Sequence, residues 1–417
     1  MPKSSRPLLI VGAAALLLLL MCSAPLLPPP AQIPVTLPAT PLVFVELPTV
    51  TPAAGTGAQQ AAPAAAPALQ PDPTRAVSTP TPGEPLIVTP TTLDVRGLAI
   101  DAYMNSLVAD QLFHGSILVA RNGQIVISKG YGMADGDRNL ANTAQTRFRL
   151  ASLTKAFTAT AILLLQERGR LSVNDSICAY LEDCPAIWQP ITIHQLLNHT
   201  SGLANYTDSL DFETTEMLPT TPSELVARFR NLPLSSTPGT LYYYGNSGYV
   251  LLGLIIERIS GLSYGEFVEE NIFGPLNMQH SGYDTSVGTI ADGLAAGYNT
   301  FSQKSGFIDL STLYAAGALY ASVEDMYRWD QALYSNRILS QPARDQMFTP
   351  YLNEYGYGWK ISRSAGRLII SHPGNMTGSS TFFASLPDDQ VTVIVLSNMY
   401  WANTTGIGSR LIQLALE

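Results

Sequence analysis

The sequence is poor in charged residues, in histidine and in cysteine. Asp, Glu, Lys and Arg make up 13% of its 417 residues, and 23 basic against 32 acidic side chains give a net charge of −9. No basic patch is visible in the sequence, which argues against nucleic acid or an anionic membrane surface as the main partner. The five histidines are scattered without the H-E-x-x-H spacing of a zinc site, so we expect neither a metal nor another cofactor.

Only three cysteines occur, which leaves one pair for the globular part of the chain. Cys22 belongs to an apolar N-terminal segment, whereas Cys178 and Cys184 lie close together in the sequence. In an oxidising compartment these two are predicted to form a small local disulfide. A metal site would need more ligands than they offer.

Residues 1–24 combine a short basic start with a long apolar run. Lys3 and Arg6 precede the run, which ends at Cys22, and this arrangement is typical of an export signal. Three interpretations stay open: a cleaved signal, a retained membrane anchor and a lipid anchor. Each places the rest of the chain outside the cytoplasm, either secreted or anchored to the outer face of the membrane.

Residues 25–94 are dominated by Pro, Ala and Thr, with few charges and little periodicity. Such a composition buries too little apolar surface to fold, so we expect a disordered linker. It would hold a globular domain away from a membrane and let it reach cell-wall polymer, unless it has no role beyond its length. The remaining residues, 95–417, are numerous enough for a large core without stabilising cross-links.

The apolar pattern of residues 95–417 predicts strands at both ends and helices in the centre. A helix is expected over 98–111, and two strands within 115–130 flank an Asn122-Gly123 turn, a strong hairpin signal. Residues 152 to about 329 are mostly helix and loop. Four more strands and a last helix follow, at 356–362, 368–371, 379–386, 391–396 and 404–416. We therefore expect an α+β fold, an antiparallel sheet built from both ends of the domain and flanked by helices, with an inserted mostly helical region.

A serine and a lysine open a long helical pattern in the centre of the chain. Ser152 and Lys155 begin an apolar-periodic stretch from 151 to 169, and residues three apart share one helix face, with Cβ atoms about 5–6 Å apart. The free N–H groups at a helix start offer a donor for an oxyanion. Partial burial would lower the pKa of Lys155 toward neutrality. The pair predicts an activated nucleophile, although S-x-x-K also arises by chance in chains of this size.

A second polar segment precedes the apolar helix predicted over 249–259. Tyr244 and Asn246 are two residues apart in a locally extended stretch, so their side chains can face one cavity. There a tyrosine would supply a base and an amide would hold a substrate. The alternative is a surface turn in which Asn246 or Ser247 caps the helix.

A third segment is an apolar strand that begins at Arg367 and runs into His372-Pro373-Gly374-Asn375. Glycine at such a strand end lets a ligand approach the backbone closely. The alternative for His372 is a strand-end histidine bonded to its own neighbours.

In the order S-x-x-K, Y-x-N and H-x-G, the three motifs resemble those of the serine penicillin-recognising superfamily, the group of class C β-lactamases, D-alanyl-D-alanine carboxypeptidases and esterases. Stretches at 191–203, 316–322 and 355–359 are also similar to it, so the resemblance covers about 98–417. It implies a β-lactamase/transpeptidase-like fold with the site between the sheet and the helical region. True β-lactamases carry Lys-Thr-Gly where this chain has His372-Pro373-Gly374, which favours an esterase or a D,D-carboxypeptidase.

The resemblance implies a two-step acyl transfer through a covalent ester on Ser152. Lys155 and Tyr244 would share the base work, and Tyr244 would help to activate the hydrolytic water. The expected substrate is an ester, a D-amino-acid amide or a peptidoglycan-type peptide.

The same resemblance assigns substrate binding to the other motif residues. Asn246 would hold a substrate amide or carbonyl, and His372 would assist a substrate carboxylate or the proton relay of Tyr244. Gly374 and Asn375 would border the substrate, with the backbone N–H groups of Ser152 and Asn375 as the oxyanion hole.

Three other functions are alternatives to this one. A β-lactamase would use the same site, and a binding module would use the same cleft to sense wall peptides or β-lactams with little turnover. A Ser-His-Asp hydrolase would use Ser263 of a G-x-S-x-G string with His199 or His372. A helix rather than a strand precedes Ser263, so we expect Gly261 to end one helix and Ser263 to cap the next.

Two loops are expected to set the choice of substrate, at 205–222 and 283–307. The acidic and aromatic residues of the first loop suggest that it forms one wall of the substrate site.

Overall fold

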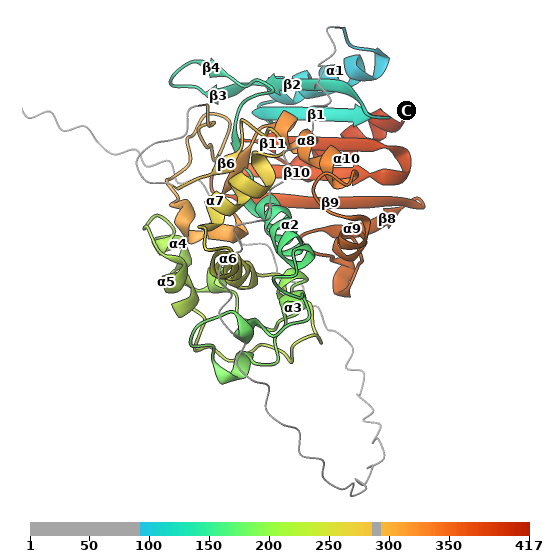
Figure 1. Ribbon diagram of the computed structural model, residues 1–417. Helices are drawn as coiled ribbons and strands as arrows, with labels where there is room; N and C mark the ends of the chain where they lie inside the picture. The colour runs from blue at the N-terminus through green and yellow to red at the C-terminus, as the bar shows by residue number, and fades with distance from the viewer. Residues whose placement is uncertain (1–91, 286–292) are drawn as a thin grey trace, which may run out of the picture. The chain divides into compact units, whose positions relative to one another are not determined.

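A computed structural model of the protein describes residues 92–285 and 293–417 (Figure 1). The predicted export segment, residues 1–24, and all but the last three residues of the predicted linker lie outside the described residues. Within the described ranges no helix is both long enough and apolar enough to cross a bilayer.

A six-stranded antiparallel sheet forms the centre of the fold, with the strand order β2-β1-β11-β10-β9-β8. The N-terminal hairpin joins the C-terminal strands where β1 pairs with β11, from Gly115 opposite Ser397 to Arg121 opposite Val391. The predicted sheet built from both ends of the domain is confirmed. The strands are β1 Gly115–Arg121, β2 Gln124–Tyr131, β8 Lys360–Ser364, β9 Arg367–Met376, β10 Ser379–Leu386 and β11 Val391–Ser397.

The hairpin between β1 and β2 follows from its two turn residues. Asn122 and Gly123 have φ angles of 51° and 74°, the left-handed conformation that a two-residue turn of type I′ requires at both positions. Asparagine and glycine adopt it at the least cost. The sequence signal therefore predicted the turn and the hairpin, whereas the shift in the pairing register between Val119 and Ala120 was not predicted.

Helices cover both faces of this sheet (Figure 1). Helices α1 (Val95–Ala109) and α10 (Thr404–Leu416) lie on one face, and α2 (Thr154–Glu167) and α8 (Val323–Leu333) lie on the other. Strand β11 is apolar at nearly every position because both of its faces are buried. Val393 belongs to the core under α1 and α10, whereas Ile394 belongs to the core under α2 and α8. Period-two alternation between two buried faces gives an almost continuous apolar run.

The remaining elements form the predicted helical insertion and two small sheets. Their bounds are α3 Ile193–Leu197, α4 Phe212–Thr215, α5 Pro222–Ala227, α6 Ser247–Ser260, α7 Tyr264–Val268, α9 Gln341–Met347, β3 Met133–Asp135, β4 Leu140–Ala141, β5 Phe148–Arg149, β6 Gly282–Tyr283 and β7 Leu319–Ala321. The predicted end of one helix at Gly261 and the predicted start of the next at Ser263 are confirmed. Gly261 ends α6 with φ 76°, and Ser263 caps α7 in a capping box with Glu266.

Two strand predictions near the third motif were wrong in their bounds. The strand predicted over 356–362 begins only at Lys360, because the glycine-rich segment before it crosses the start of α2: a Cβ on Gly358 would lie 2.8 Å from Ala156 Cα. The strand predicted to end at Ser371 continues to Met376, because β10 pairs with it to its end. Pro373 fits there because β8 pairs with β9 only as far as Ser371, which leaves that edge free.

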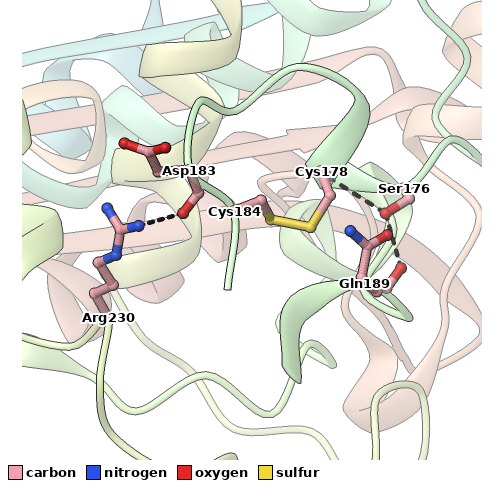
Figure 2. Close-up of a disulfide and its surroundings, with 6 residues drawn as sticks. All are labelled: Ser176, Cys178, Asp183, Cys184, Gln189 and Arg230. Carbon is pink, nitrogen blue, oxygen red and sulfur yellow. Dashed lines mark hydrogen bonds between the residues drawn. A yellow bond between two sulfur atoms is a disulfide. The ribbon is translucent and has the colours of Figure 1, made fainter. Parts of the chain in front are cut away.

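The predicted disulfide joins Cys178 and Cys184 (Figure 2). Ser176 braces one end of the loop, because its Oγ accepts a hydrogen bond from the backbone N–H of Cys178 and donates one to the carbonyl of Gln189, 2.8 Å away. Arg230 braces the other end through a hydrogen bond to the carbonyl of Asp183. The disulfide prediction is therefore confirmed.

Candidate active site

Ser152 lies in a 3-10 turn, Ala151–Leu153, that runs directly into α2. The residue before it, Ala151, is buried with a φ of 50°, a left-handed conformation that an alanine adopts only when its surroundings impose it. The sheet imposes it here, since the Thr381 hydroxyl of β10 donates a 3.0 Å hydrogen bond to the Leu150 carbonyl. The turn is thus fixed by contacts of residues far apart in the sequence.

Lys155 is fully buried one turn after Ser152, with its amine 3.1 Å from Ser152 Oγ. The same amine lies 2.8 Å from Asn246 Oδ1 and 2.9 Å from the carbonyl of Ala316. Burial lowers the pKa of Lys155 to about 7, because no carboxylate compensates for the lost hydration of the ammonium. A neutral amine is therefore accessible at neutral pH.

The partners of Lys155 direct its lone pair when the amine is neutral. The Ala316 carbonyl can only accept a hydrogen bond, and Asn246 presents its oxygen because its Nδ2 donates to Thr207 Oγ1, 3.1 Å away. A neutral amine has two N–H donors, and these two acceptors use both. The lone pair is left facing Ser152 Oγ, which is the orientation a general base needs.

Tyr244 completes the group around Ser152. Its pKa is raised, mainly by burial, while a hydrogen bond with Ser152 opposes the rise. The Lys155 amine lies 5.0 Å from the centre of the Tyr244 ring. The tyrosine is therefore a neutral phenol beside the nucleophile in the resting protein, and a phenolate is disfavoured there.

His372 lies inside β9 and is almost completely buried, at 3% exposure. Burial and the nearby Lys155 lower its pKa to about 3, so its ring is neutral at physiological pH. One ring nitrogen, Nδ1, faces the carbonyl of Pro373 at 2.6 Å, and the other, Nε2, lies 2.8 Å from the hydroxyl of Tyr355. A carbonyl only accepts, so Nδ1 carries the proton and Nε2 accepts from Tyr355. This bonding to neighbours matches the alternative that the sequence left open.

Gly374 explains how β9 approaches the nucleophile. A Cβ at this position would lie 2.5 Å from the Leu150 carbonyl oxygen and 3.2 Å from the backbone nitrogen of Ser152. Only glycine allows the strand to lie this close to the turn. The next residue, Asn375, is exposed and borders the same space as Ser152.

A cavity of about 140 Å³ opens at Ser152. Its polar wall includes Asn246, Thr207 and Asn375, and Phe212 contributes to its apolar wall. Ser152, Asn246 and Asn375 were predicted to meet and do so. Lys155, Tyr244 and His372 are not among the residues that line it: Lys155 and His372 are buried, whereas Tyr244 is partly exposed beside Ser152.

The structure adds three residues that the motifs did not single out. Thr207 fixes the amide of Asn246, Tyr355 hydrogen-bonds to His372, and Glu216 borders the cavity. The expectation that residues 205–222 form a wall of the site is confirmed by Thr207 and Glu216. The sequence signal was the acidic and aromatic content of that loop, which could not tell which side chains turn inward.

The alternative serine hydrolase site is not assembled. Ser263 is committed to its cap on α7, and His199 is buried among Tyr244, Tyr249 and Tyr355 with its pKa held well below the ordinary value by burial. Among residues 92–285 and 293–417, no group of three His, Cys, Asp or Glu side chains could hold a metal ion.

Comparison with known proteins identifies the family of the chain. The sequence pattern of the family described as Beta-lactamase matches residues 100–407. The chain belongs to this family. PbpX of Bacillus subtilis, a protein named as a penicillin-binding protein, is 34% identical over 291 residues, which cover 69% of this chain and 71% of the relative.

Solved structures extend the likeness to the fold. A penicillin-binding protein from Bacillus halodurans superposes with a TM-score of 0.68 at 29% identity, covering 75% of this chain and all of that one. A D-stereospecific amidohydrolase from Streptomyces gives a TM-score of 0.65 at 25% identity and covers 76% of this chain and 97% of that one. The fold is therefore that of the superfamily of serine β-lactamases and penicillin-binding proteins, as the motifs indicated.

Proposed function

We propose that the protein is an extracytoplasmic serine acyl hydrolase that acts through an acyl-Ser152 intermediate on an ester or on a D-amino-acid peptide or amide. The observation that carries the proposal is the amine of Lys155, which is buried, has a pKa of about 7 and lies 3.1 Å from Ser152 Oγ. Family membership and the likeness to a D-stereospecific amidohydrolase support it. The Cys178–Cys184 disulfide supports a location in an oxidising compartment.

The first step forms the covalent ester. Neutral Lys155 takes the proton of Ser152 while Oγ attacks the acyl carbon, and the bond from that carbon to the leaving oxygen or nitrogen then breaks. Tyr244, a phenol beside Ser152, passes a proton to the leaving group and recovers one from the Lys155 ammonium. The leaving group departs neutral, and Lys155 is free again.

The oxyanion of this step would be stabilised by the backbone N–H groups of Ser152 and Asn375. Both residues border the cavity, and Gly374 brings β9 against the turn of Ser152. Losing one donor of such a pair typically slows acyl transfer by about 10² to 10³-fold.

The second step removes the acyl group. A water molecule attacks the ester carbon while its proton passes to Lys155 through Tyr244. The bond to Ser152 Oγ then breaks, and the Lys155 ammonium, 3.1 Å away, returns the proton to Oγ, which gives the free acid, the serine hydroxyl and neutral Lys155. His372 is neutral and bonded at both ring nitrogens, so its part is to position Tyr355 and β9 rather than to exchange protons.

The test is mass spectrometry of the intact full chain after separate incubation with a fluorescent penicillin and with p-nitrophenyl acetate. A covalent adduct or a burst of p-nitrophenol that is lost in Ser152→Ala and retained in Ser263→Ala would establish the acyl-enzyme. Ser263 is the matched control because it belongs to the competing G-x-S-x-G string.

Each outcome assigns a function class. Stable penicillin adducts with ester turnover fit the proposed hydrolase, whereas rapid turnover of the penicillin would make the protein a β-lactamase. Reversible ligand binding that survives Ser152→Ala, without adduct or turnover in the folded protein, would replace the proposal by a binding module.

A further inference from the structure

One carboxylate in the cavity of Ser152 has no part in the mechanism above. Glu216 follows helix α4 and borders the cavity together with Ser152 and Asn246. Among the described residues that line this cavity, it has the only ionisable side chain. The wall of this cavity therefore presents a negative charge to a bound acyl group on the side of Glu216.

Glu216 is held in place but is not neutralised. Thr377, which follows β9, donates a 3.2 Å hydrogen bond to Glu216 Oε1, and the Glu216 backbone carbonyl accepts one from the Asp309 N–H at 2.9 Å. None of the ion pairs in the described part of the chain includes Glu216. Burial raises its pKa, and the nearby Glu213 adds to the rise. A cationic group of a bound ligand would stabilise the carboxylate of Glu216 and so oppose the rise in pKa that burial and Glu213 cause.

Size restricts where that cation can be. The cavity measures about 140 Å³, which is below the range of roughly 300–1,000 Å³ typical of small-molecule sites. A group that reaches from Ser152 to Glu216 within it is short. One part of the wall, formed by Phe212, Leu313 and Met376, is apolar and suits a small aliphatic side chain.

We infer that Glu216 binds the free ammonium group of an aminoacyl substrate, so that the protein takes small amino-acid esters, amides or peptide N-termini in preference to N-acylated ones. The inference rests on the proposed function and narrows its substrate class. Ser152 forms an ester with the aminoacyl carbon, the bond to the leaving oxygen or nitrogen breaks, and water then releases the amino acid. The ammonium keeps its proton throughout.

An N-acylated substrate meets the opposite situation. Its amide nitrogen is neutral and its extra acyl group fills the space next to Glu216, which would leave the carboxylate desolvated without a partner. The same wall disfavours substrates with a carboxylate on the acyl side. The proposed specificity is therefore produced as much by rejection of the wrong substrate as by attraction of the right one.

The experiment compares kcat/KM for D-alanine p-nitroanilide and N-acetyl-D-alanine p-nitroanilide at pH 7 in the full chain, in Glu216→Gln and in Glu213→Gln. The wild type should prefer the free amine by about 10-fold or more, and Glu216→Gln should lose most of that preference through KM. Glu213→Gln is the matched control, since Glu213 is exposed and does not line the cavity. The preference should also fall as pH rises past about 8, where the α-amino group loses its proton.

The result that overturns the inference is a wild type that hydrolyses the N-acetyl substrate as well as the free amine, or a preference that persists in folded Glu216→Gln. If neither anilide is cleaved, the corresponding amides compete with p-nitrophenyl acetate for Ser152, and equal protection by both overturns it as well. p-Nitrophenyl acetate carries no amine and reports the nucleophile alone. Absence of its Ser152-dependent burst would therefore sink the proposed function itself, whereas a normal burst with no amine preference removes only the role of Glu216.

Discussion

The two sides of the candidate site differ in how they are built. On one side Ser152, Lys155 and Tyr244 are packed between α2, α6 and the sheet, and the polar groups of Lys155 and Asn246 are all hydrogen-bonded. On the other side lies the segment 205–222, made of short helical turns with exposed residues, in which the carboxylate of Glu216 borders the cavity. The first side fixes the reaction and the second chooses the substrate, so substitutions in the two should differ in kind as well as in size.

The largest effect is expected for Lys155→Met. The change removes the base but keeps an unbranched side chain only one atom shorter, so acylation by p-nitrophenyl acetate should slow by about 10³-fold, within the range typical of lost general-base catalysis. Lys129→Met is the control, because Lys129 is a surface lysine paired with Asp101 far from the cavity. Retention of more than a tenth of the acylation rate would move the base role to Tyr244.

Lys155→Met should also change how the free energy of unfolding depends on pH. The folded pKa of Lys155, about 7, is below the unfolded value of about 10.4, so between these pH values the unfolded chain binds more protons than the folded one. The free energy of unfolding should therefore rise with pH from about 7 to about 10 in the wild type. Lys155→Met should remove that part of the rise. Thermal melts over this pH range measure it, and identical slopes in both proteins would contradict a buried amine.

The next effect in size is expected for Gly374→Ala. Its new Cβ would lie 2.3 Å from Thr381 Oγ1 and 2.5 Å from the Leu150 carbonyl oxygen, so β9 must move away from the nucleophile turn. A displacement on the order of 1 Å at a reacting centre can cost about 10²-fold in rate. Gly306→Ala, where the added Cβ meets no atom within 4 Å, should leave the acylation rate within about 2-fold. Equal rates in the two variants would show that the close approach is not needed.

A smaller and more diagnostic effect is expected for Asn246→Asp. The rate of the wild type should rise with pH through about 7, since only neutral Lys155 accepts the serine proton. A carboxylate 2.8 Å from the amine, where Asn246 Oδ1 now lies, stabilises the ammonium and should move the rising limb to higher pH by about one unit or more. The measurement is the midpoint of the pH profile of kcat/KM. An unchanged midpoint, matching that of the exposed-turn control Asn139→Asp, would rule out Lys155 as the titrating group.

The sequence predicted the reaction side of the site better than the substrate side, for a physical reason. Ser152 and Lys155 are one helical turn apart, and the Asn122-Gly123 pair adopts the turn conformation by itself, so residues close in the sequence determine both features. The caps at Gly261 and Ser263 are local in the same way.

Other features depend on partners that are distant in sequence. The strand β9 extends past Ser371 because β10 pairs with it. His372 does not line the cavity at Ser152, and its Nε2 is hydrogen-bonded to Tyr355 instead. Glu216 faces the cavity because Thr377 and Asp309, more than ninety residues away, hold its side chain and backbone. The sequence pattern within residues 205–222 could not predict these contacts.

The smallest effect is expected for Phe212→Ala in the substrate wall. Phe212 packs edge-on against Tyr206 and borders the cavity, so its loss should raise KM about 3- to 10-fold for small acyl substrates, in line with a partly lost apolar contact of about 1 kcal/mol. The turnover number should stay within about 2-fold, because the contacts of Lys155 are untouched. Leu210→Ala is the control, since Leu210 lies in the same segment and is fully exposed. A fall in kcat as large as that of Gly374→Ala would mean that the loop also positions the nucleophile, and the division of the site into a reaction side and a substrate side would then be wrong.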